Sequence, residues 1–222
     1  SEAAKRQQEA EGEARKLSGQ HPALEAYAKE TETLRQQITE MTRLLDDEKA
    51  RLAQIKSETA RVRDSRTAAQ QVLEIGSIGG DFSELLRAMR AQLPVTSQLA
   101  RSIWERDQIL VDARLKRLQA DEGRRALADT GGMADKVIAA SVKQGEPEPG
   151  PDVRPALEKL VAARRDLYVQ LQDTLVTQIA QLAELNAAER DLLNQTSQLR
   201  ALLNSRLLWL PSSAPVGVGW FD

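Results

Sequence analysis

The sequence predicts an all-α protein, an elongated antiparallel bundle or coiled coil of three long helices with short accessory helices. The chain has 222 residues, of which 3% are aromatic and 29% charged, a composition typical of long helices that pack along narrow seams. Apolar residues recur every seven positions over two long stretches. Neither 23–75 nor 156–208 contains proline or glycine, so each stretch favours one uninterrupted helix.

Residues 1–22 are predicted to form an N-terminal helical segment, read here as the end of a truncated helix, which stops at Ser18-Gly19-Gln20-His21-Pro22. His21, the only histidine, is expected to be an exposed turn residue. Residues 23–143 are predicted to hold the first and second long helices with a short connecting helix. Two sets of heptad positions define the seam of the first long helix, over 24–75: Leu24, Thr31, Ile38, Leu45, Leu52, Thr59, Arg66 and Leu73, and Tyr27, Leu34, Met41, Glu48, Ile55, Val62 and Ala69.

The first long helix is expected to end at the glycine-rich turn 76–80, and the short connecting helix to cover 84–93. Pro94 restarts the chain as a second long helix over 95–128, with Leu99, Ile103, Leu110 and Ala113 facing inward. Trp104 on this helix is interpreted as a packing anchor, with a partner surface as the alternative. Gly131-Gly132 is expected to interrupt the helix, leaving a brief helical turn or two over 133–142.

Residues 144–151 form a flexible Pro/Gly linker, which is expected to be exposed. Residues 152–208 are predicted to be the third long helix, with Pro155 tolerated in its first turn. Its apolar stripe comprises Leu157, Leu160, Leu167, Leu171, Leu175, Ile179, Leu182, Leu185, Leu192, Leu199 and Leu203. Because no helix can bury its stripe alone, we expect the three to run up, down and up within one chain.

Residues that would support catalysis or metal binding are scarce. The chain has no cysteine and one histidine, which excludes thiol catalysis, a histidine-based triad and a multi-histidine metal site. The acidic run Asp46-Asp47-Glu48 lies on a helix, where consecutive side chains point in different directions and do not converge on one ion. Glu48 and Arg66 are interpreted as residues that set the register of the seam. We therefore predict a non-enzyme that needs no cofactor and no metal.

The formal net charge of −2, with both signs interspersed, provides no basic face for nucleic acid. No apolar run reaches the roughly 20 residues that cross a bilayer, so we expect the fragment itself to be soluble. Residues 209–222, which follow the last long helix, form an irregular connector that contains Trp209, Pro211, Pro215, Trp220 and Phe221. Tryptophan favours boundaries between apolar and wet surroundings, so the connector is interpreted as membrane-proximal. The alternative is a strap that folds back and caps the helices.

The pattern resembles the periplasmic coiled-coil ("porin") domain of large MscS-like mechanosensitive channels, the potassium-efflux KefA/MscK type. The resemblance covers most of the chain from about residue 24. It is carried by the leucine-rich helix end and Trp-Pro-Trp connector at 202–220, and by Ile78-Gly79-Gly80, Leu85-Leu86 and Arg90-Ala91-Gln92-Leu93-Pro94.

The resemblance implies a non-catalytic domain on the periplasmic side of the bacterial inner membrane, a helical rod that transmits or modulates gating. Its implied partners are the remainder of the same channel polypeptide, its own copies in a homo-oligomer and the membrane next to the C-terminus. The chain holds no pore-forming sequence. A soluble coiled-coil scaffold or adaptor that recruits partner helices is the alternative function.

Overall fold

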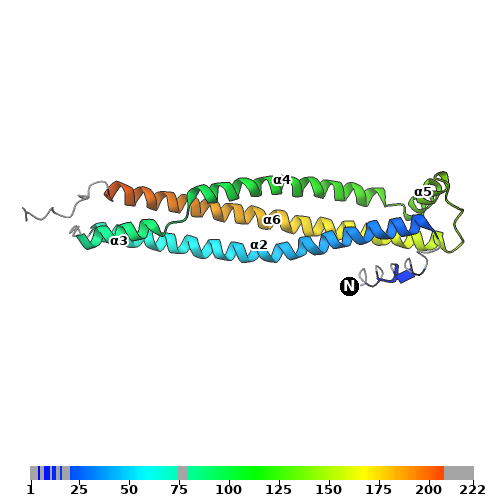
Figure 1. The fold of residues 1–222 in the computed structure, drawn as a ribbon, viewed down its shortest axis with the longest axis horizontal. Coiled ribbons are helices and arrows are strands. Elements are labelled where there is room, and N and C mark those ends of the chain that lie inside the picture. Colours follow the sequence, from blue (N-terminus) through cyan, green and yellow to red (C-terminus); the bar gives the residue numbers. More distant parts are fainter. Residues whose placement is uncertain are drawn as a thin grey trace, which may run out of the picture. The chain divides into compact units, whose positions relative to one another are not determined.

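The computed structural model describes residues 21–74 and 80–207, with residues 5, 8–10, 12–13 and 16 of the N-terminal segment; the side chains of 80–83, 206 and 207 are not described. Most of the described residues are helical and none lies in a strand, which confirms the all-α class. The helices that follow the N-terminal segment are α2 (Pro22–Glu74), α3 (Gly80–Ala91), α4 (Thr96–Ala126), α5 (Thr130–Lys143) and α6 (Val153–Leu207), as Figure 1 shows.

The chain divides into two compact units that do not follow the order of the sequence. The first unit combines Ser1–Glu48 with Ile109–Leu182, and the second combines Lys49–Gln108 with Ala183–Asp222. Each unit therefore contains a stretch of each long helix. The seam predicted for α2 is confirmed in both units, since every one of its heptad positions from Leu24 to Leu73 is buried or half-buried.

In the first unit, buried leucines of α6 form the centre of the core. Leu157 and Leu160 pack with Leu24 and Tyr27 of α2, with Leu127 after α4 and with Ala134 of α5. A smaller cluster joins Leu175 to two alanines of α4, Ala113 and Ala120. These small residues let α4 approach α6 closely. Gly123 continues the pattern, since a Cβ at this position would lie 2.6 Å from Cζ of Tyr168.

In the second unit, the core joins α6 to all three of the helices that precede it there. Its buried members on α6 are Leu185, Leu192, Leu199 and Leu203. They pack against Ile55, Val62 and Ala69 of α2, Leu86 of α3 and Leu99 of α4. Lys56 pairs with Glu184 and Arg63 with Asp191, so α2 and α6 run in the same direction. Arg106 contacts Glu189 while Thr96 contacts Arg200, so α4 runs the opposite way. The expected order of up, down and up holds within this unit.

The environment of His21 differs from the sequence expectation. The residue is 1% exposed, not an exposed turn residue. Its Nδ1 accepts a hydrogen bond of 3.2 Å from the backbone N–H of Ala23, and Nε2 lies 3.1 Å from the carbonyl oxygen of Pro147. The ring thus satisfies a free N–H in the first turn of α2 and holds the linker to the start of this helix. The remaining linker residues are mostly exposed, as predicted.

The helix after α4 is longer than the sequence predicts, and glycine does not interrupt it. Gly131 and Gly132 lie in the first turn of α5. The helix is interrupted just before them, between Ala126 and Thr130. Asp129 is the N-cap, because its side chain accepts a 2.9 Å hydrogen bond from the N–H of Gly132. A strong cap at this position offsets the weak helix propensity of two glycines.

Replacing His21 by alanine is expected to destabilise the first unit by about 1 kcal/mol or more, because the cap of α2 and the bond to the linker are both lost. His21→Asn retains a capping acceptor and should recover part of the loss. Urea unfolding followed by circular dichroism measures both, with Lys29→Ala on the exposed face of α2 as the control. Equal stability of the wild type and His21→Ala would contradict the structural role.

Candidate functional site

The most buried polar cluster lies between α4 and α6 in the second unit. Glu189 is 0% exposed, and its carboxylate receives two hydrogen bonds from the guanidinium of Arg106, of 2.7 and 3.2 Å. Arg106 also donates to Asn186 at 2.8 Å and to the hydroxyl of Ser102 at 3.1 Å. Ser102 in turn donates to Glu189 at 3.3 Å. The buried charges are therefore paired and hydrogen-bonded on several sides.

The partners extend outward from this cluster to solvent. Asn186 donates to Asp107 at 2.6 Å, and Arg190 donates to the same carboxylate at 3.0 Å. Arg51 of α2 approaches Glu189 at 3.7 Å, so all three long helices of the unit contribute. A slip of α4 along α6 would strand Glu189 among leucines without its partner. The cluster thus fixes the register of the two helices.

In the first unit, Arg164 of α6 performs a similar task towards α2. Its guanidinium stacks on Tyr27, with 3.6 Å from Cζ to the ring centroid, and donates to the Tyr27 carbonyl at 2.8 Å. It also donates to the hydroxyl of Thr31 and to Glu30, both at 3.0 Å. Burial raises the pKa of Tyr27, while the nearby positive charge of Arg164 opposes that shift.

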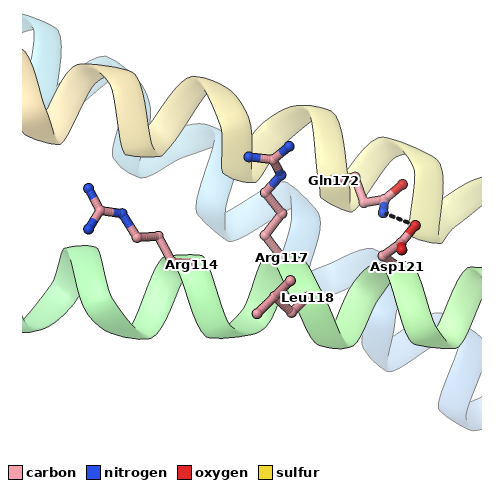
Figure 2. A pocket seen from close by; sticks show the side chains of 5 residues that line it. All are labelled: Arg114, Arg117, Leu118, Asp121 and Gln172. Atoms are coloured by element: carbon pink, nitrogen blue, oxygen red, sulfur yellow. Dashed lines mark hydrogen bonds between the residues drawn. The ribbon is translucent and has the colours of Figure 1, made fainter.

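A cleft of about 470 Å³ lies between α4 and α6 of the first unit. It is lined by Arg114, Arg117, Leu118 and Asp121 of α4 and Gln172 of α6, and Figure 2 shows these side chains. Gln172 donates to Asp121 at 3.1 Å and closes one end of the cleft. Hydrogen bonds from Arg124 and Gln172 lower the pKa of Asp121, so this carboxyl is ionised at neutral pH. We name this feature the α4–α6 cleft.

The two arginines of the α4–α6 cleft lack a carboxylate partner. Neither Arg114 nor Arg117 forms an ion pair with any described residue, whereas Asp121 is already paired with Arg124 and Arg125. A guanidinium donates hydrogen bonds in a planar fork that matches a carboxylate or phosphate. The chemistry available in the cleft is therefore the binding of an anionic group beside an apolar side chain, Leu118.

A second recess, of about 840 Å³, lies between α2 and α4 of the same unit. Tyr168 and Leu171 of α6 contribute to its lining, together with Gln178, and Leu44 and Ile109 are exposed apolar residues at α2 and α4. The small residues of α4, Ala113 and Ala120, do not fill the space between these helices. Gln178 is buried and has no side-chain hydrogen bond to any described residue.

The interpretation of Trp104 as a packing anchor is wrong. Its side chain is 63% exposed on α4. The inward positions of this helix on either side of it are Ile103 and Arg106, both buried. The heptad of α4 passes through Arg106, and this position places Trp104 on the opposite side of the helix. The partner-surface alternative for Trp104 stays open.

The predicted site residues of the connector, Trp209, Pro211, Pro215, Trp220 and Phe221, lie outside the described residues. Of the two predicted register-setting residues, Arg66 is half-buried and bonds to Gln198 of α6. Glu48 is half-buried on α2.

Sequence reasoning missed the Arg106–Glu189 pair. A usable signal existed, because each residue occupies a heptad position between apolar neighbours: Ile103 and Leu110 flank Arg106, while Leu185 and Leu192 flank Glu189. Two oppositely charged residues in facing seams predict a pair only when the register of the helices is known, and this register comes from the tertiary structure.

The described residues include no group of three or more His, Asp or Glu side chains placed to hold a metal ion. Among their helices, none combines the length and apolar character of a membrane span. No protein-family model, curated protein or solved structure matches the chain.

Removing one member of the buried pair should be far more costly than replacing both. Arg106→Met and Glu189→Leu are each expected to lower the free energy of unfolding by about 3–5 kcal/mol, because each leaves a buried charge without its bidentate partner. The double variant should recover most of the loss, since two apolar side chains then meet in the seam. Urea unfolding of the four proteins gives the coupling energy directly. Additive losses in the double variant would show that the two residues act independently.

Proposed function

We propose that the chain is the non-catalytic extramembrane helical domain of a bacterial mechanosensitive channel of the large MscS-like, KefA/MscK type. The proposal is supported by the resemblance of the helix end and connector at 202–220, and by the uninterrupted course of α6 from Val153 to Leu207. In this function the domain lies on the periplasmic side of the inner membrane and contributes to a potassium-efflux channel. The pore, the contacts between subunits and the membrane spans belong to other parts of the polypeptide.

The observation that carries the mechanism is the buried pairing of Arg106 with Glu189. A helix transmits an axial displacement only when its neighbours do not slip past it. The bidentate pair, with distances of 2.7 and 3.2 Å, opposes such slipping between α4 and α6 in the second unit. Displacement of the bundle is then passed along α6 into the connector at 209–222, which leads to the membrane in the proposed channel.

Insertion of flexible residues into the channel tests this mechanism. A Gly/Ser insertion after Leu210 should uncouple the helical domain from the membrane region and alter the pressure threshold measured by patch clamp. The same insertion in the linker 144–151, placed after Pro147 so that its contact with His21 is kept, should alter this threshold much less, because the linker is mostly exposed and contributes no residue to the cores. Equal effects of the two insertions would contradict force transmission through α6.

Truncation after Leu210 distinguishes a membrane-proximal connector from a strap that caps the helices. If the connector serves the membrane, the melting temperature of the isolated bundle should stay nearly unchanged. A bundle that unfolds on truncation would instead use its tryptophans as a strap.

A soluble scaffold that recruits partner helices is the second candidate function. The exposed apolar residues of α4, including Trp104 and Leu118, favour it, because a helix buried only on its inner side has no need of them. The sequence downstream of Asp222 discriminates the two functions. A nearby membrane span supports the channel, and a stop codon supports the scaffold.

Both functions predict a bundle that needs no metal. The cysteine-free sequence has one histidine, and His21 is committed to the backbone groups of Ala23 and Pro147. Thermal melts recorded with and without EDTA should superimpose. A shift of several degrees would reveal a structural metal ion and contradict the prediction.

A further inference from the structure

The α4 helix of the first unit is apolar on two opposite sides. Leu110, Ala113 and Ala120 are buried on the inner side. Val111, Leu115 and Leu118 are exposed, with exposed fractions of 61%, 52% and 65%. The steps of four and three residues between them are those of a coiled-coil seam. We name Val111, Leu115 and Leu118 the outer seam of α4. Its residues have the spacing of the inner seam, yet no described residue covers them.

The α6 helix extends the apolar surface across the α4–α6 cleft. Val169 and Val176 are both exposed and lie one heptad apart, so they share a face of α6. Gln172 lies between them on the same face and bonds to Asp121 of α4. Exposed apolar residues thus lie on each of the two helices that form the cleft, Leu118 in its lining and Val169 and Val176 on the same face of α6 as Gln172.

The net uncompensated charge at this surface is positive. Arg114 and Arg117 line the cleft next to Leu118, as Figure 2 shows. Neither arginine has an ion-pair partner among the described residues. Arg165, four residues before Val169 on the face that carries it, also has none within the part of the chain that the structure describes. Of the nearby acidic residues of α4, Asp112 and Asp121 are paired already, with Lys116 and with Arg124 and Arg125, so that Glu122 is the one acid of these three without an ion pair to a described residue, against three arginines.

This combination favours a helix over a membrane or a small anion as the occupant. A seam with heptad spacing accepts a row of apolar side chains from another helix, and arginines beside it accept carboxylates from the flank of that helix. Val111 to Leu118 spans about 10 Å, or two helical turns, at about 1.5 Å per residue. An anionic bilayer binds surfaces with a large excess of basic residues, whereas here Asp112, Asp121 and Glu122 are interspersed among the arginines.

We propose that the α4–α6 cleft and the outer seam of α4 dock an amphipathic helix of a partner protein, with acidic residues along the flank of its apolar face. The partner's leucines or similar side chains cover Val111, Leu115 and Leu118, while its carboxylates pair with Arg114 and Arg117. The proposal adds a partner to either candidate function, and it stands independently of the channel.

Two labelled peptides test the proposal on the full chain. Both are helical and carry leucine at the heptad seam positions, but one has glutamate and the other lysine at the flanking positions. Fluorescence anisotropy should detect binding of the glutamate peptide and little binding of the lysine peptide. Because exposed ion pairs are screened by salt, the affinity for the glutamate peptide should fall as the salt concentration rises.

Charge reversal provides the sharpest variant. Arg114→Glu with Arg117→Glu should weaken binding of the glutamate peptide by about tenfold or more and strengthen binding of the lysine peptide. Leu118→Gln should weaken binding of the glutamate peptide, but this variant should still bind the glutamate peptide more tightly than the lysine peptide. Lys143→Glu, an exposed residue of α5 with no ion pair to a described residue, is the matched control and should bind as the wild type does. Circular dichroism melts of each variant establish that the bundle is intact.

Three results would overturn the proposal. Equal binding of the two peptides, or no effect of the charge reversal, would remove the role of the arginines. Binding to anionic phosphatidylserine vesicles that is lost in the same variants would identify a membrane surface. Self-association of the chain, measured by sedimentation and abolished by Leu118→Gln, with no binding of the glutamate peptide, would identify a second copy as the occupant.

Discussion

Burial of α6 is the constraint on which the rest of the structure depends, because each unit builds its core around leucines of this helix. Leu157 and Leu160 are fully buried in the first unit, as are Leu192 and Leu199 in the second. Each such side chain contributes about 1.5–3 kcal/mol when it leaves water. The α2 and α4 helices are polar over much of their surface and present narrower apolar seams. Their positions follow from where those seams meet α6.

A leucine seam stabilises helix pairing but specifies its register weakly, because one leucine layer resembles the next. The polar residues of the seams supply the missing specificity. Glu189 with Arg106 in the second unit, and Arg164 with Tyr27 and Thr31 in the first, are satisfied only in one alignment. Small residues add a steric restriction, since Gly123 leaves room for Tyr168 where a larger side chain would collide. The proposed mechanical role relies on this resistance to slipping.

The inner and outer apolar positions of α4 differ in the size of their side chains and in the reason for it. Inner positions such as Ala113 and Ala120 are small because α6 lies close to them. Outer positions such as Val111 and Leu118 are larger and apolar although solvent surrounds them. Folding of the isolated chain does not explain that choice, since an exposed apolar side chain contributes little to stability. Binding does, and it links the outer seam to the arginines of the α4–α6 cleft.

The sequence by itself determined the three long helices, their order and the buried face of α2, because heptad spacing is local information and long helices end at proline and glycine. It did not determine the start of α5, where the Asp129 cap outweighs two glycines. It did not determine the burial of His21, whose partner Pro147 is 126 residues away in the chain. Nor did it reveal the Arg106–Glu189 pair or the exposure of Trp104. These depend on which turn of α4 faces which turn of α6, and this alignment is decided only when the cores of the two units pack.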